Sequence, residues 1–220
     1  MKKLIQGIVD FRRNVREGYR EAFGKLATGQ SPDTLFIACS DSRVVPNTFA
    51  STDPGDLFVL RNIGNLVPPC DGHGVSLSDE SEAAAIEFST QILSVTDIIV
   101  CGHSECGAML AICDGRERVQ LPNLKSWLRH GETALASLQR GQAPDHTLAR
   151  HNQLSQLNVL SQIENIKSYP SVKKRMSEGN LQLHAWWFDI ARADVYAYEE
   201  ELKRFVLIDE VEAKRLLDRL

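Results

Sequence analysis

The chain has 220 residues, of which 43% are hydrophobic and 25% charged, and its formal net charge is −4. This composition is typical of one globular domain, residues 1–220, and it excludes the basic field that nucleic acid or an anionic membrane would require. Gln6, Asp10 and Arg12 interrupt the apolar start and no apolar run reaches membrane length, so neither a signal peptide nor a membrane span is expected.

The first predicted element is an amphipathic helix over residues 3–28, in which apolar side chains recur at helical spacing between arginines. We interpret residues 1–30 as a helical arm that packs on a partner subunit and residues 31–220 as an α/β core. Short apolar runs at 34–38, 56–60 and 97–101 predict buried strands. A helix over 79–93, capped by Asp79, precedes the third run.

This alternation predicts an α/β fold with a central, mainly parallel sheet flanked by helices. Beyond the third strand, the pattern predicts helices over 107–112, 124–138 and 148–166. A late pair of strands is expected over 181–190 and 194–198. No repeat or linker divides the chain.

Chemically active residues follow two of the predicted strands. Cys39 ends the first strand, and His103 and Cys106 follow the third. Because ligands collect beyond the carboxyl ends of parallel strands, we expect these residues to meet. Two thiolates and an imidazole suit zinc, and three protein ligands leave a fourth position for water or substrate, which favours catalysis. Five cysteines, an odd number in a chain too long to need disulfides, favour a reducing cytoplasm.

Asp41 and Arg43 lie two residues apart after the first strand, on one face of an extended segment. An ionised carboxylate only accepts hydrogen bonds, so Asp41 can orient a bound water or hydroxide. Arg43 can clamp the carboxylate and keep it ionised.

Other residues offer alternatives. Cys101 lies two residues before His103 on the same predicted strand, so both side chains face the same side of the sheet and Cys101 is an alternative ligand to Cys106. A cysteine in a strand is, however, usually a small buried hydrophobic residue. Cys70 and His73 have ligand spacing but lack further ligands for a second metal. Ser104 could be a nucleophile in an incomplete G-x-S-x-G elbow. An alternative function is a non-catalytic zinc-stabilised module used for assembly. Because structural zinc sites usually have four protein ligands, a permanent fourth ligand at Asp41 would favour this alternative.

Four segments together resemble the β-class carbonic anhydrases, in their plant-like bacterial branch. They are CSDSRV at 39–44, PGDLFVLRNIGN at 54–65, AAIE at 84–87 and VCGHSECGAM at 100–109. The resemblance implies one Zn²⁺ per subunit on Cys39, His103 and Cys106, with an Asp41–Arg43 dyad. It further implies reversible hydration of carbon dioxide to bicarbonate by attack of zinc-bound hydroxide. The implied assembly is a homodimer that forms tetramers or larger oligomers.

The resemblance also implies a small apolar substrate pocket. Its candidates here are Phe58, Ile63 and Phe88, with Gln30 donating a hydrogen bond to a substrate oxygen. Phe88 stands where that branch usually has tyrosine, so one hydroxyl is lost. Relatives with the same zinc ligands hydrolyse carbon disulfide, an alternative that the motifs leave open.

Some family members close the site at low pH, when the aspartate moves onto zinc and bicarbonate binds beside a tryptophan, an arginine and a tyrosine. Aligned through the motifs, the tryptophan is Phe36, a neighbouring glycine is Ala38 and the tyrosine is Phe188. Only Arg61 remains. The resemblance therefore implies an open site near neutral pH, with Asp41 bound to Arg43.

Overall fold

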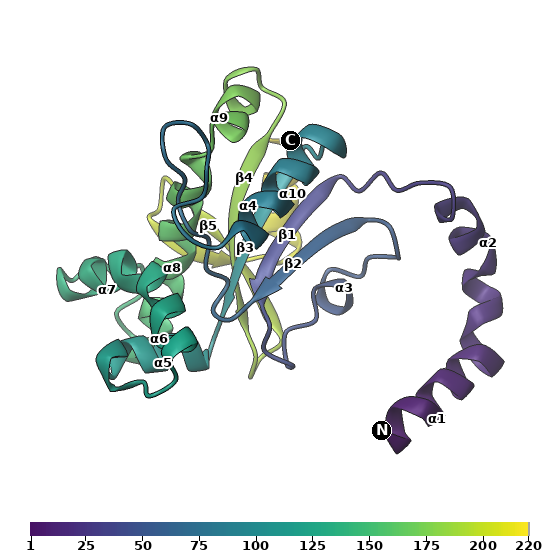
Figure 1. The fold of residues 1–220 in the computed structure, drawn as a ribbon, viewed down its shortest axis with the longest axis horizontal. Helices are drawn as coiled ribbons and strands as arrows, with labels where there is room; N and C mark the ends of the chain where they lie inside the picture. Colours follow the sequence, from purple (N-terminus) through teal and green to yellow (C-terminus); the bar gives the residue numbers. More distant parts are fainter. Residues whose placement is uncertain (220) are drawn as a thin grey trace.

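A computed structural model describes residues 1–219, which are built around one six-stranded sheet of order β2-β1-β3-β4-β5-β6 (Figure 1). The strands are β1 Thr34–Cys39, β2 Leu57–Asn62, β3 Asp97–His103, β4 Gln182–Asp189, β5 Asp194–Glu199 and β6 Arg204–Leu207. Strands β2, β1, β3 and β4 run parallel, and β5 and β6 are antiparallel additions. The predicted mainly parallel sheet is confirmed.

Ten α-helices lie within residues 1–219. They are α1 Lys2–Asp10, α2 Arg16–Leu26, α3 Pro46–Phe49, α4 Glu80–Glu87, α5 Gly107–Cys113, α6 Pro122–Trp127, α7 Glu132–Gln139, α8 Arg150–Lys167, α9 Pro170–Ser177 and α10 Glu210–Leu217. Shorter turns of π type join α1 to α2 and extend α4, and 3₁₀ turns follow α5 and α6. None of these helices is long and apolar enough to cross a membrane.

The chain order places β1 between β2 and β3, so the direction of winding changes at β1. Cys39 pairs with Asn62 at the carboxyl end of β2, and Ala38 pairs with Cys101 of β3. The carboxyl ends of β1 and β3 therefore meet at a switch point, where open α/β sheets bind their ligands.

Helix α8 packs closely on β3 and β4. Gly102 permits this approach, because a Cβ at that position would lie 2.6 Å from Val159 Cγ2 and 3.2 Å from the Ser155 carbonyl oxygen. Val159 and Ile163 of α8 join the core on this face of the sheet. The helix is thereby held against the end of β3 that carries His103.

The N-terminal arm stands away from the sheet (Figure 1). The predicted single helix is interrupted by a π turn at Phe11–Val15, and no residue of the arm from Lys2 to Leu26 is buried. Its apolar stripe is open, with Ile5 56% and Ile8 68% exposed. Such a stripe needs a partner to be covered.

Two other expectations are modified. The predicted helix over 124–138 is divided into α6, a 3₁₀ turn Leu128–Gly131 and α7. The turn packs on α5, since a Cβ at Gly131 would come within 2.5 Å of Ile112 Cδ1. Asp79 caps α4 as predicted by accepting from the Ser81 N–H, but Glu82 accepts from Asn62. Strand β6 and helices α3, α9 and α10 are not predicted from the sequence.

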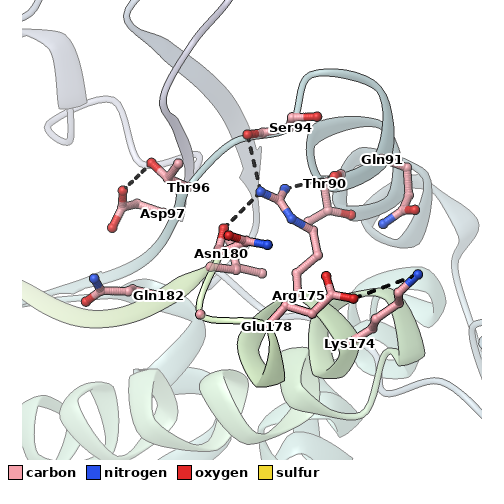
Figure 2. Close-up of a pocket in the computed structure, with 12 residues that line it drawn as sticks. Thr90, Gln91, Ser94, Thr96, Asp97, Lys174, Arg175, Glu178, Asn180 and Gln182 are labelled. Carbon is pink, nitrogen blue, oxygen red and sulfur yellow. Dashed lines mark hydrogen bonds and ion pairs between the residues drawn. The ribbon is translucent and has the colours of Figure 1, made fainter.

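A cavity of about 640 Å³ lies at the opposite end of the strands from Cys39 and His103 (Figure 2). Its walls include Asp97 and Gln182, the first residues of β3 and β4. Arg175 crosses this cavity and donates to the carbonyl oxygens of Thr90, Ser94 and Asn180. Its guanidinium therefore ties α9 to the turns at this end of the sheet.

Candidate metal centre

Cys39, His103 and Cys106 form one buried cluster. One ligand atom from each lies within 4.8 Å of the other two. Cys39 is the last residue of β1, His103 the last of β3 and Cys106 the N-cap of α5. The structure thus brings together the three residues that the sequence predicts as ligands.

The His103 ring is oriented for a ligand. Its Nδ1 lies 2.8 Å from the Ser104 carbonyl oxygen, which requires that nitrogen to carry the proton. Nε2 is then an acceptor, and it is buried without a hydrogen-bond partner among residues 1–219. A buried unpaired nitrogen beside two thiols fits a metal ion that prefers nitrogen and sulfur.

The two thiols favour a shared negative charge. A hydrogen bond from Cys106 lowers the pKa of Cys39, against the opposing effect of burial, and the Gly64 N–H also donates to Cys39 Sγ at 3.3 Å. The pKa of Cys106 is raised because its proton is held by Cys39 and because it is buried. Loss of the proton that remains on Cys106 therefore requires a nearby cation. A metal ion bound by both thiolates would supply that positive charge.

Asp41 is held by Arg43 through both of its carboxylate oxygens. The Arg43 backbone N–H and Nε donate to Oδ1 at 3.0 and 2.9 Å, and Nη2 donates to Oδ2 at 2.7 Å. These bonds to the guanidinium hold the pKa of Asp41 far below its usual range. The carboxylate is consequently ionised at neutral pH and is bound to Arg43.

Arg61 of β2 binds the backbone of the segment that carries Cys39 and Asp41. Its guanidinium donates to the carbonyl oxygens of Cys39 and Asp41 at 2.6 to 3.0 Å. Aromatic rings pack together beside Arg61 and β1: Phe36 is fully buried, and its ring centroid lies 6.0 Å from that of Phe49. Phe49 stacks on Phe188 with ring centroids 4.8 Å apart. These rings offer no hydrogen-bond donor to an anion.

A buried polar stripe on α8 also serves the cluster. Asn152 Oδ1 accepts from the Glu105 N–H, Ser155 Oγ donates to the His103 carbonyl oxygen, and Asn158 Nδ2 donates to that of Gly64. The helix over 148–166 is predicted from Leu154, Leu157, Leu160 and Ile163, which do not indicate these polar contacts. The signal in the sequence is the recurrence of small polar residues at 152, 155 and 158, three residues apart and therefore on one side of the helix.

The predicted substrate-pocket residues are divided between the two ends of the sheet. Ile63 lies near the cluster, directly before Gly64, and its carbonyl oxygen accepts from Trp127. Phe58 pairs with Leu35, four residues before Cys39, so it lies roughly 13 Å away along the strand. Phe88 stacks on Phe58 at 5.7 Å, and the exposed Gln30 precedes the start of β1. Within one chain these three residues do not reach the cluster.

The alternative residues have other roles. Cys101 is fully buried among the residues around Phe36 and is not part of the cluster. Ser104 Oγ accepts from the Ile190 N–H, and no histidine bonds it among the contacts of residues 1–219. Cys70 Sγ contacts Ser168 Oγ, and His73 is exposed. Neither of the last two belongs to a metal-sized group in the described chain.

His130 should make stability depend on pH. Burial lowers its pKa to about 4, below the unfolded value of about 6.5. The unfolded state then binds more protons between these values, so this contribution is complete above about pH 6.5 and is lost as pH falls toward 4. Urea unfolding should show that His130→Asn removes up to about 3 kcal/mol of this pH dependence. His146→Asn, at an exposed site, is the control; equal pH slopes in all three proteins would contradict the assignment.

Comparison with known proteins points to one family. The carbonic anhydrase family model matches residues 34–195. A carbonic anhydrase of Pseudomonas aeruginosa is 41% identical over 212 residues, covering 96% of this chain and 93% of that protein. One from Synechocystis is 36% identical and covers 94% of this chain and 74% of its own.

Solved structures agree with this similarity. The β-carbonic anhydrase CcaA superposes with a TM-score of 0.86 at 36% identity, covering 96% of this chain and 92% of that one. A tetrameric β-carbonic anhydrase of Sordaria macrospora gives a TM-score of 0.76 at 31% identity, over 89% and 95% of the two chains. In each case the similarity extends over nearly the whole fold.

Proposed function

Because the chain belongs to the β-class carbonic anhydrases, we propose that it holds one Zn²⁺ on Cys39, His103 and Cys106 and hydrates carbon dioxide reversibly to bicarbonate and a proton. The observation that carries the zinc assignment is the unpartnered, buried Nε2 of His103 beside two thiols. Three protein ligands leave the fourth position to water or substrate. When bound, the metal would supply the Lewis acidity that makes water a nucleophile near neutral pH.

The chain's own contribution to the reaction is orientation. Asp41 remains ionised on Arg43 and can only accept, so it holds the proton of the attacking oxygen and directs the lone pair of that oxygen toward carbon dioxide. Two thiolates weaken the pull of the metal on water, which makes this acceptor more important. Ile63, beside the cluster and 47% exposed, offers apolar surface for the carbon dioxide molecule.

An open site near neutral pH accompanies this mechanism. Arg61 is occupied by the carbonyl oxygens of Cys39 and Asp41, and aromatic rings fill the space beside Phe36. Both features oppose a bicarbonate site at this position. The thiolate ligands also need a reducing environment, and the five free cysteines support a cytoplasmic location.

A second copy of the chain would complete the substrate pocket. Gln30, Phe58 and Phe88 lie at the end of the sheet away from their own cluster, and the arm exposes an apolar stripe. A homodimer in which the arms embrace the partner accounts for both observations, and the chain resembles a tetrameric relative. We therefore assign residues 1–30 to assembly and residues 31–220 to the zinc-binding core of a single domain.

The assembly is tested by placing a charge in the arm. Burying Ile8 should contribute roughly 2 kcal/mol, so Ile8→Asp should weaken dimerisation by at least about 30-fold. Sedimentation velocity should show smaller particles, and the carbon dioxide hydration rate should fall with them while zinc content is retained. Arg13→Gln, on the polar side, is the control. An unchanged particle mass in Ile8→Asp would exclude the arm from the interface.

The function itself is tested by stopped-flow hydration of carbon dioxide. The protein is measured as purified, after removal of metal by a chelator, and after addition of one equivalent of Zn²⁺. We expect the activity to disappear and return with the metal. A protein whose fold needs zinc but whose hydration rate never exceeds background would instead be a structural zinc module.

A further inference from the structure

Glu105 has an unusual backbone for its position between two ligands of the cluster. Its φ is +56°, in the left-handed region where glycine is the usual residue. It separates His103 from Cys106, so this conformation sets the relative direction of the two ligand side chains. A residue that keeps such a conformation without being glycine must be held by its surroundings.

Asn152 supplies that support from the first turn of α8. Its Oδ1 accepts from the Glu105 backbone N–H at 2.8 Å, and its Nδ2 donates to Glu105 Oε1 at 2.9 Å. Asn152 is only 7% exposed, which shields these bonds from water. His151 Nε2 lies 3.1 Å from Glu105 Oε2, the other carboxylate oxygen. One carboxamide therefore binds both the backbone and the side chain of Glu105.

The carbonyl oxygen of Glu105 links the Asn152–Glu105 contact to the Asp41–Arg43 pair. Arg43 Nη2 donates to it at 3.0 Å and donates to Asp41 Oδ2 at 2.7 Å. A shift of Glu105 would therefore move the guanidinium that holds Asp41. The ligand segment and the Asp41–Arg43 pair share one anchor.

We propose that Glu105 and Asn152 are a positioning pair that sets the geometry of the zinc ligands and, through Arg43, of Asp41; this inference rests on the function proposed above. Neither residue touches the reacting atoms. The carboxyl oxygen that accepts from Asn152 is the required feature, rather than the negative charge of Glu105, because Asn152 is neutral. His151 adds a more exposed contact from the same helix turn.

The test compares four variants for zinc affinity by competition with a chromophoric chelator, and for the visible spectrum of the Co²⁺-substituted protein. Glu105→Gln keeps the accepting oxygen and should behave as wild type. Glu105→Ala and Asn152→Ala should each weaken zinc binding by about 10- to 100-fold and alter the Co²⁺ spectrum. Glu105→Gly tolerates the left-handed backbone but lacks the carboxylate, so it should resemble Glu105→Ala and remain folded.

A double variant and a surface control complete the design. Because both residues serve one contact, Glu105→Ala with Asn152→Ala should be no worse than either single change. Glu164→Ala, which removes an exposed ion pair with Lys167 on the same helix, should have no effect. If the wild type binds zinc and the Ala and Gly variants bind it with the same affinity, the positioning pair is wrong. Weakened zinc binding in Glu105→Gln would also contradict it. Both outcomes leave the proposed function intact. A wild type that neither binds zinc nor hydrates carbon dioxide would overturn the proposed function as well.

Discussion

Cys106→Ser is expected to produce a folded protein that no longer retains zinc and has lost carbon dioxide hydration by about three orders of magnitude or more. In the proposed zinc site the Cys106 thiolate is a ligand, and a serine hydroxyl does not ionise near neutral pH to replace it. Folding should survive because Cys106 is the N-cap of α5, a position that serine favours. Metal analysis after dialysis and stopped-flow hydration measure the two effects, with circular dichroism to verify the fold.

Cys101→Ser is the matched control for this change. Cys101 is equally buried, but it lies on the face of the sheet around Phe36 and outside the cluster. Its substitution should cost some stability while zinc content and activity remain. If Cys101→Ser emptied the site and Cys106→Ser left it full, the ligand assignment would be wrong.

Asp41→Asn is expected to keep zinc and lose activity by roughly 10²- to 10⁴-fold, the usual contribution of a positioned proton acceptor. The change replaces an oxygen that accepts from Arg43 with an NH₂ group, which cannot accept. Asp41 is not among the three clustered ligands, so the metal content should stay at one per chain. Stopped-flow rates and metal analysis on the same sample separate the two effects.

The pH profile sharpens this prediction. The Arg43 guanidinium keeps the pKa of Asp41 far below the neutral range, so Asp41 stays ionised throughout the pH range of the assay. The residual activity of Asp41→Asn should therefore keep the pH dependence of wild type at a lower rate. Loss of zinc from the variant would instead make Asp41 a ligand, and an unchanged rate would remove it from the mechanism.

The sequence predicts the central part of this protein well. The runs that became β1 and β3 are short and apolar, and the strands end at Cys39 and His103, so the parallel sheet and the meeting of these residues follow from local pattern and general topology. Element boundaries are less exact. The helix expected over 124–138 is broken because Gly131 packs against Ile112, a contact distant in sequence.

The supporting contacts could not be predicted in the same way. Asn152 and Asn158 are 47 and 94 residues from the backbone groups that they bind. Their role depends on which face α8 turns toward β3, and that is decided by packing at Gly102. The spacing of Leu154, Leu157, Leu160 and Ile163 predicts the helix, but it does not indicate which polar residues of α8 face the sheet.

By itself, the sequence predicted the cysteine and histidine cluster, the Asp41–Arg43 pair beside it and the parallel sheet that brings them together, because each depends on residue chemistry and on short segments at strand ends. Only the tertiary structure decided that Glu105 is anchored by Asn152, that Arg43 also donates to the Glu105 carbonyl oxygen, and that Phe58 lies at the far end of the sheet. These features depend on strand register and on helix packing between distant segments. Local pattern does not specify such long-range contacts.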